Sequence, residues 1–494
     1  MADEQELQKA KALVETLERE LSARCSPIDV YKAYYRGEQP LKFASDEFRK
    51  YHGARYRDFA DNWVQVVSDS PVERLTVTGI KPYGADKADG ESMRVWQANG
   101  LDADSQLGFL GAVTSARAFA LVWGDPGDDE TPVVTFEDAS SCIVAYEPGS
   151  RRMRRAALRR WQDGDTYMAV LYLPGEVWKF ERPVDRRTKT EDMADVDRQL
   201  DGWRPREMRD EPNPQPNPMG VVPVVELLNR PLLVDDPISD VAGVVPMQDA
   251  VNLLWAQLFT ASDYAAFPQR VVLGAERPMI PILNAAGEVV GERPLDLEKL
   301  AADRIAFFSG ENAKIAEWTA ANLEAYTKVI EVAVGHIAAQ TRTPQHYLIG
   351  KMANLSADAL LAAETGLVKR VEEKQLWYGQ AIREVFALIA LARGEDSKSR
   401  DLRSGYMLWA DAESRSQAQL ADALLKLKQI GFPFEFLALR YGLTPAEVVD
   451  LLAMIERENQ LDPLGAAAAM MAQRPAPAED AVALEGDLLA EETA

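Results

Sequence analysis

The sequence predicts an α+β fold that is mainly helical, with an antiparallel β meander and a second, small β module set between long helices. Three patterns indicate this fold. A long apolar stripe with helical spacing lies within residues 354–392, six short β-rich runs lie between residues 118 and 182, and another strand-and-turn stretch, 267–310, separates two helical stretches. Because Gly, Pro and Asp turns separate the six runs closely, we expect antiparallel pairing.

The longest predicted helix begins with Ser356 as its N-cap. A continuous helix over this stretch is roughly 55 Å long at 1.5 Å per residue. Glycine weakens a helix interior, so we expect a bend or a change of packing partner near Gly366 or Gly379. Glu364 and Lys374 interrupt its apolar stripe. The stripe consists of Leu360, Leu367, Val371, Tyr378, Ile382, Val385 and Ile389.

A second predicted helix, residues 239–266 with an interruption near Pro246, is apolar on nearly all sides. Such a helix needs neighbours all round, and either its own domain or adjacent subunits must supply them. The side chains expected to pack between subunits are Val251, Leu254, Trp255, Leu258 and Phe259.

Shorter elements complete the prediction. Residues 7–21 have the a/d spacing of a docking helix, 211–218 is an extended proline-rich loop, and 221–228 is typical of a buried strand. The strands expected in the meander are 118–123, 133–136, 142–146, 156–161, 167–173 and 176–180.

Two further regions have recognisable boundaries. Residues 284–287 predict a hairpin turn between the strands 280–283 and 288–290. The C-terminal helices expected are 412–429, with Gly431 as C-cap, then 434–441 and 445–458, before a tail too poor in apolar residues to fold.

The charge balance restricts the class of partner. The 494 residues carry 55 Lys and Arg against 78 Asp and Glu, and this net charge of −23 argues against a broad basic surface that grips nucleic acid. Cys25 and Cys142 form at most one disulfide, so a reducing compartment is expected. Neither a secretory signal nor a membrane span is expected, because residues 1–24 are polar and 241–262 contain polar residues and a proline.

Motifs for catalysis are not found. The sequence has no P-loop, no His-Glu-x-x-His, no Gly-x-Ser-x-Gly and no Cys-x-x-Cys, so we expect no catalytic residue, no metal and no cofactor. Carboxylate pairs such as Asp102 with Asp104 lie in turn-like sequence and suit solvated loops better than a metal site. The arginines of 151–160 suit the solvated face of strands better than a nucleic-acid patch.

Five segments, taken in order, resemble the portal proteins of tailed bacteriophages, in particular the siphophage type with a long kinked helix. Their order and spacing carry the likeness, which spans most of residues 25–395. The segments are YKAYYRGEQP (31–40), PVVELLNR (223–230), the helix at 240–268, AAQTRTP (338–344) and NLSADAL (354–360).

The resemblance implies a portal fold in a closed ring, typically of twelve subunits, at one vertex of a capsid. It divides the chain into parts along its length. These are an N-terminal helix (1–22), a wing (23–235), a stem helix (236–266), a clip (267–317), a second stem helix (318–344), a tunnel loop (345–353), a long helix returning to the wing (354–403), a helical crown (404–464) and a disordered acidic tail (465–494).

The resemblance also implies roles for particular residues. The tunnel-loop residues expected at the DNA channel are His346, Tyr347, Lys351 and Met352, of which Lys351 is the one formal cation. The clip residues expected to contact an adaptor or terminase are Asn284, Gly287 and Glu288.

The implied partners are those of a virus particle. They are further copies of this chain, the terminase large subunit, the major capsid and scaffolding proteins, a head–tail adaptor protein, and double-stranded DNA that passes without sequence specificity. No membrane is implied. The expected location of the protein is the virion, after assembly in the host cytoplasm.

Our hypothesis is therefore a non-enzymatic portal through which DNA is packaged and ejected, and which docks the terminase motor and head–tail connector proteins. One alternative is a carboxylate-dependent enzyme acting on DNA or polysaccharide, which needs several acids converging in one cleft. Another is a helix-turn-helix DNA-binding protein using residues 420–454. A reading helix presents Arg, Lys, Asn or Gln near its start, and residues 446–450 present none.

Overall fold

The structure is a computed structural model. It describes residues 4–42, 46, 50, 61–184, 202–207, 211–266, 270–273, 279–284, 287–294, 305–308, 314–317, 322–350, 357–413, 417–443 and 445–461. The chain has two compact units, Met1–Glu413 and Ser414–Ala494.

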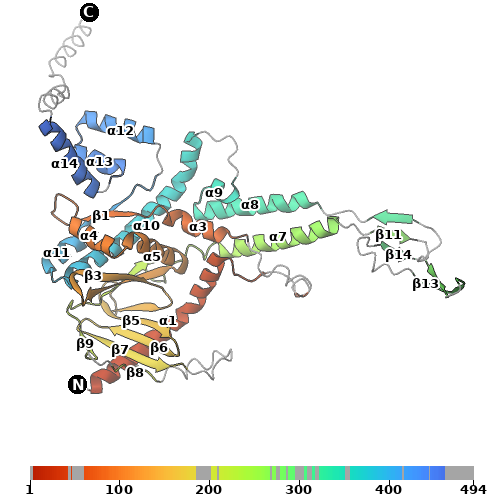
Figure 1. Ribbon diagram of the computed structural model, residues 1–494, viewed down its shortest axis with the longest axis horizontal. Coiled ribbons are helices and arrows are strands. Elements are labelled where there is room, and N and C mark those ends of the chain that lie inside the picture. Colours follow the sequence, from red (N-terminus) through yellow and green to blue (C-terminus); the bar gives the residue numbers. More distant parts are fainter. Residues whose placement is uncertain are drawn as a thin grey trace, which may run out of the picture. The chain divides into compact units, whose positions relative to one another are not determined.

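The first unit contains helices of very different length (Figure 1). They are α1 (Glu4–Arg36), α3 (Trp63–Val72), α4 (Gly90–Ala98), α5 (Leu101–Ser115), α7 (Val245–Ala266), α8 (Leu323–Thr341), α9 (Gln345–Ile349), α10 (Ala357–Ala392) and α11 (Asp396–Arg403).

Most strands of this unit belong to two antiparallel sheets, one of order β10-β2-β3 and one of order β4-β5-β6-β7-β8 with β9 beside β7. The six predicted meander strands and the predicted strand at 221–228 are confirmed. The bounds are β2 (Arg117–Asp125), β3 (Asp128–Glu137), β4 (Cys142–Tyr146), β5 (Arg154–Asp163), β6 (Thr166–Tyr172), β7 (Glu176–Pro183), β8 (Arg204–Pro205), β9 (Gln215–Pro216) and β10 (Val224–Leu228).

Side chains of β2 alternate between two cores and so place the two sheets face to face. Ala118, Ala120 and Val122 are buried with α5 and α10. Phe119 and Leu121 point the other way and are buried against the larger sheet. Since successive residues of a strand face opposite sides, the smaller sheet lies between the helices α5 and α10 and the larger sheet.

Helix α1 covers the remaining face of the larger sheet. Val14, Leu17 and Leu21 pack there with Trp178 and Phe180. The predicted apolar spacing of residues 7–21 is thus a docking face, but the prediction that this helix ends at residue 22 is wrong. The helix continues to Arg36 through Pro27, because its later turns pack on further parts of the unit.

Helix α10 confirms the longest predicted helix, and its apolar stripe is buried from Leu367 to Ile389. Both glycines are places of close approach. An added Cβ would lie 3.4 Å from the Arg342 side chain at Gly366 and 3.4 Å from Trp409 at Gly379. The predicted N-cap, Ser356, lies outside the described residues.

The pairing of β1 (Val77–Lys81) with β16 (Tyr406–Trp409) is not predicted from the sequence. The prediction that residues from 404 onward are a helical crown is wrong at β16, which is an antiparallel strand of the first unit. Ala412, predicted to begin a helix, is buried in the core of this unit instead.

The described residues between α7 and α8 form strands, as predicted, in two small sheets. Strand β11 (Arg270–Leu273) pairs in parallel with β14 (Ile305–Phe308) and antiparallel with β15 (Lys314–Glu317). A separate hairpin is formed by β12 (Met279–Leu283) and β13 (Val289–Pro294).

The second unit is helical over its described residues, with α12 (Gln417–Ile430), α13 (Phe434–Tyr441) and α14 (Pro445–Leu461). Gly431 follows α12 with φ +103°, as predicted for a C-cap. Helix α12 begins later than the predicted residue 412. The predicted disordered tail, 465–494, lies outside the described residues.

Candidate functional site

Helices α7 and α8 pack side by side along one apolar core (Figure 1). Val251 and Leu258 of α7 are buried there, as are Ile330, Val334 and Ile337 of α8. The spacing of three, four or seven residues puts each set on one face of its helix. The pair is therefore held together within a single chain.

The polar residues of α7 anchor it to α1 and to the start of α3. Tyr34 Oη donates a hydrogen bond of 2.6 Å to Asp249 Oδ1, and the backbone N of Asp61 donates one of 3.2 Å to Asn252 Oδ1. Trp255 Nε1 donates to Asp61 Oδ2 at 2.9 Å. Polar residues that interrupt the apolar character of this helix are thus structural contacts.

The five α7 side chains predicted to pack between subunits divide into two groups. Val251 and Leu258 are covered by their own chain. Not every apolar side chain of this helix therefore needs another subunit to cover it. Leu254, Trp255 and Phe259 remain partly exposed, and the rings of the last two stack at 5.6 Å. Contact of this second group with another subunit stays a prediction.

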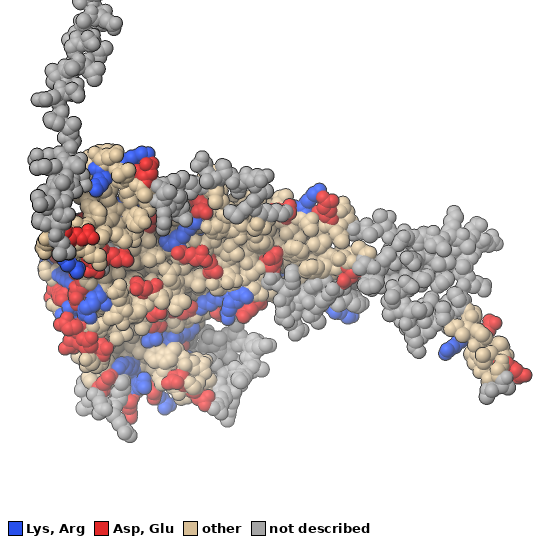
Figure 2. Space-filling model, turned by 45° about the horizontal axis from the view of Figure 1, so that its top comes forward, with Lys and Arg blue, Asp and Glu red and all other residues tan. Residues whose placement is uncertain are grey.

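Helix α8 has an exposed apolar stripe that sequence reasoning does not predict. Val329 is 52% exposed and Val332 is 59% exposed. Exposed Ala325 and Ala339 continue the stripe, and the exposed imidazole of His336 lies on the same face. Figure 2 shows a largely uncharged surface over α7 and α8. Apolar side chains gathered on one exposed face mark a surface for another protein.

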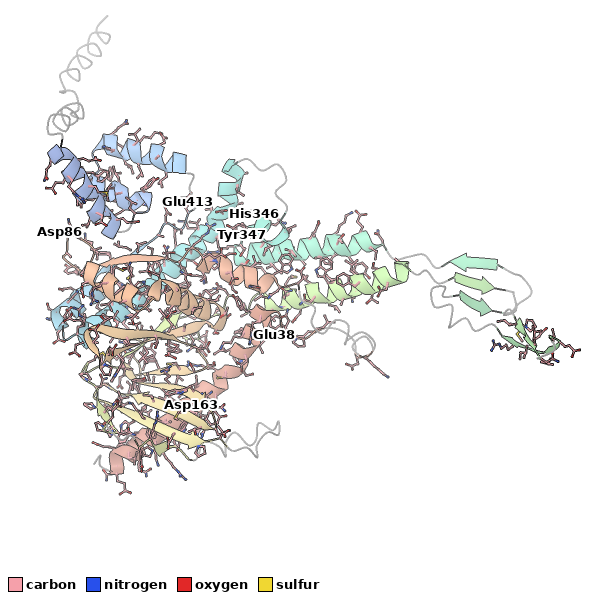
Figure 3. All side chains as sticks on the ribbon, viewed as in Figure 1. Glu38, Asp86, Asp163, His346, Tyr347 and Glu413 are labelled. Atoms are coloured by element: carbon pink, nitrogen blue, oxygen red, sulfur yellow. The ribbon has the colours of Figure 1, made fainter. Side chains whose placement is uncertain are left out.

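The predicted tunnel loop begins with a short helix. His346 and Tyr347 lie on α9, directly beside the beginning of α10 (Figure 3). Tyr347 Oη accepts a 2.8 Å hydrogen bond from Arg74, whose guanidinium also pairs with Glu364 at 2.9 Å. His346 Nε2 lies 3.8 Å from Glu364 Oε1. Glu364, an apparent break in the apolar stripe, thus helps to fix α9 on α10.

These contacts hold the two predicted residues against their own chain. His346 has only 10% of its side chain exposed. The other two predicted tunnel residues, Lys351 and Met352, lie outside the described residues. Contact of all four with DNA stays a prediction.

The second break in the stripe, Lys374, belongs to a buried charge network that sequence reasoning misses. Lys374 Nζ lies 2.7 Å from Asp240 Oδ2 and donates a 2.6 Å hydrogen bond to Asn229 Oδ1. Arg370 lies 2.7 Å from the same Asp240 oxygen and donates to the carbonyl oxygen of Val67 at 3.1 Å. The network joins α10 to α3 and to the chain leading into α7.

The electrostatics of this network keep its members charged. Burial acts to raise the pKa of Asp240, but the charges of Lys374 and Arg370 outweigh it and hold that pKa well below the usual range. Burial lowers the pKa of Lys374, and the Asp240 carboxylate opposes this. Because both partners lie on neighbouring elements, the ion pairs fix the position of α10.

The predicted clip residues form the turn of the β12–β13 hairpin. The Asn284 backbone N donates to the Glu288 carbonyl oxygen at 2.9 Å, and the Asn284 side chain accepts from Glu288 N at 2.9 Å. Gly287 has φ +84°, which favours glycine. The hairpin also exposes large apolar side chains, of which all but Met279 lie in the predicted strands 280–283 and 288–290. They are Met279, Ile282, Leu283, Val289 and Val290.

Two kinds of feature are absent from the part of the chain that the structure describes. No group of three or more His, Cys, Asp or Glu side chains there is placed to hold a metal ion. None of the helices described is both long and apolar enough to span a membrane.

Comparison with known proteins agrees with this architecture. The family model described as phage portal protein, SPP1 Gp6-like, matches residues 15–440. The portal protein of Mycobacterium phage L5 is 28% identical over 373 residues, which are 73% of this chain and 70% of that protein. The portal protein of Mycobacterium phage D29 has the same identity and coverage. Since the family model covers well over half of the sequence, the chain belongs to the SPP1 Gp6-like family of phage portal proteins.

Proposed function

We propose that this chain closes into a ring, with twelve as the expected number of copies, around a channel for double-stranded DNA at one capsid vertex. Membership of the portal family supports an oligomer associated with a capsid. The observation that carries the ring itself is the exposed stripe on α8, with Val329 and Val332 at its centre.

Leaving this apolar stripe in water is unfavourable. Fully burying a valine side chain contributes about 1.5–3 kcal/mol. One chain covers the opposite face of α8 with α7 and leaves this face open. A head-to-tail contact closes into a ring when the rotation between copies divides a full turn, and every stripe is then covered by the neighbouring copy.

In this ring α7 and α8 are the stem, and the strands between them are the clip. The exposed apolar side chains of the β12–β13 hairpin suit a contact with a head–tail adaptor or the terminase large subunit. Residues 23–235 with α10 form the wing, which meets the major capsid and scaffolding proteins. The DNA contact is assigned to residues 345–353, with Lys351 as the cation.

The experiment is a mass measurement of purified protein by light scattering at micromolar concentration. We expect a large oligomer for the natural sequence and a shift to smaller species for Val332→Asp, because a charge would be buried at each contact. Leu107→Asp is the matched control, since Leu107 lies on α5 and is 67% exposed. It should leave the assembled mass unchanged.

Two results would count against the proposal. A natural chain that stays monomeric, with and without other capsid proteins, would remove the ring. Normal rings formed by Val332→Asp would remove the α8 stripe as the contact, and the assembly would then need another surface.

A further inference from the structure

A cavity of about 410 Å³ in the first unit has an unusual charge balance. It lies between α10, the end of α8 and the chain leading into α7. Four cations, Arg230, Arg342, Arg370 and Lys374, line it together with two acids, Asp240 and Glu373. This basic pocket therefore has a surplus of two positive charges, four minus two, in a chain whose net charge is −23.

The inner wall of the basic pocket is fixed. The side chains of Arg370 and Lys374 are 9% and 1% exposed, and both pair with Asp240, which is 4% exposed. Two buried cations thus share one buried carboxylate. Their remaining donors are satisfied by neutral groups: the carbonyl oxygens of Thr341 and Val67 for Arg370, and the Asn229 side chain for Lys374. One positive charge of this wall is therefore not balanced by a carboxylate, so a further anion in the pocket would have a favourable charge interaction with it.

The rim of the basic pocket is formed by two arginines with an unfavourable backbone conformation. Among the described residues, three non-glycine residues have positive φ, and Arg230 (φ +46°) and Arg342 (φ +53°) are two of them. Left-handed conformations favour glycine. Arg230 also precedes Pro231, a position that disfavours helical conformations. Arg342 is also the C-cap of α8, so both turns place a guanidinium group at the rim of the pocket.

Both rim guanidinium groups remain available to a ligand. Arg230 is 52% exposed and reaches Asp240 only at 4.0 Å. Arg342 is 55% exposed and pairs with Glu373 at 3.2 Å on the surface. Surface pairs of this kind contribute little, so an incoming carboxylate can replace or join them at small cost.

The shape of the basic pocket favours a side chain over a bare ion. Its volume of about 410 Å³ equals that of roughly fourteen waters at about 30 Å³ each. Val244 and Trp377 provide apolar surface beside the cations. The methylene groups of a glutamate or aspartate can pack on that surface while its carboxylate meets the arginines.

We propose that the basic pocket accepts a carboxylate side chain from a second copy of this chain, so that each pocket is completed by its neighbour. The inference rests on the proposed ring. A second copy is the partner that the charges favour, because its 78 acidic residues outnumber its 55 basic ones. Charge pairs across a contact set which surfaces meet.

The first test measures assembly of the double variant Arg230→Gln with Arg342→Gln. We expect the protein concentration at half-assembly to rise at least about tenfold, with unchanged circular dichroism. Arg400→Gln is the control, since Arg400 is an exposed arginine on α11 outside the pocket. Rings that form equally well in the double variant and the natural chain would overturn this inference while leaving the proposed ring intact.

The second test identifies the acid. In Arg342→Lys, a carbodiimide joins the introduced amine to any carboxylate in direct contact, and mass spectrometry of mixed isotope-labelled and unlabelled subunits shows whether the link crosses between copies. We expect a link between copies that the same treatment of Arg400→Lys does not give. Links confined to Glu373 or Asp240 of the same chain would contradict the proposal.

A third experiment distinguishes a protein carboxylate from a phosphate group as the ligand of the basic pocket. Inorganic phosphate and a short DNA duplex are each added to the dissociated natural protein and to the double variant, and the unfolding temperature is measured. We expect no difference between the two proteins. A rise of several degrees in the natural protein alone would assign the pocket to phosphate and overturn the carboxylate.

Discussion

Asp240 is a buried carboxylate that ties α10 to the chain leading into α7. Its carboxylate holds Arg370 and Lys374 of that helix at 2.7 Å each, with all three side chains at most 9% exposed. Removing Asp240 leaves Arg370 and Lys374 buried without their carboxylate partner. The consequences are larger than those of the surface pairs elsewhere in the chain.

Asp240→Asn should therefore lower the free energy of unfolding by about 3–5 kcal/mol, measured by urea denaturation at pH 7. Adding Lys374→Met to it should recover part of the loss, because one of the two unpaired cations is then gone. Lys369→Met is the matched control, since Lys369 is 65% exposed and pairs only at the surface. A loss below 1 kcal/mol in Asp240→Asn would show that the network is dispensable.

The same residue predicts a dependence on acid. The folded pKa of Asp240 lies below its usual value, so its contribution is present above the unfolded pKa of about 3.9 and is lost as the pH falls further. Between pH 5 and pH 2.5 the natural protein should lose more unfolding free energy than Asp240→Asn does. Parallel curves for the two proteins, from urea denaturation at each pH, would contradict the assignment.

For single helices and strands, the local sequence pattern predicts the element when the element's own periodic apolar face is what stabilises it. The meander strands and α10 follow from alternation and from apolar spacing, because each buries its own periodic face. Glu364 and Lys374 break that spacing for a reason the sequence near them does not contain. Their partners, Arg74 and Asp240, come from distant parts of the chain.

The candidate contact surfaces likewise divide into those that local sequence predicts and those that depend on distant parts of the chain. The hairpin turn at Asn284 follows from turn chemistry. The stripe at Val329 and Val332 becomes visible only when α7 is known to cover the other face of α8. The pairing of β1 with β16 joins segments more than 300 residues apart, and no periodicity specifies such a partner.

Gly405 shows how closely β1 and the turn before β16 approach. An added Cβ there would overlap the carbonyl oxygen of Lys81 and lie 3.2 Å from that of Leu402. Gly405→Ala should lower the free energy of unfolding by about 1–3 kcal/mol, since backbone must move. Gly124→Ala is the control, because nothing lies within 4 Å of its added Cβ. Equal stability of the two variants in urea would contradict the close approach.

At the scale of the whole molecule, the net charge of −23 bears on how DNA passes. Duplex DNA has one negative charge per about 1.7 Å of its axis, so many phosphate contacts would hold it in register. A channel for translocation needs DNA to move freely and therefore needs few phosphate contacts. Because the chain as a whole is acidic, we expect few cations to face the DNA in this channel.

Assembled protein should therefore retain duplex DNA only weakly, with a Kd no tighter than about 10⁻⁶ M at physiological salt, and equally for unrelated sequences. Fluorescence anisotropy with two duplexes of different sequence measures this. Lys351→Ala should leave ring formation unchanged but alter packaging or retention of DNA. The control is Lys328→Ala, the same change at an exposed lysine on α8, which should alter neither packaging nor retention. Tight retention of one duplex over the other would favour a sequence-reading protein instead. Unchanged packaging and retention in Lys351→Ala would leave the portal in place but remove that lysine as its DNA contact, since a sterically guided duplex needs no particular cation.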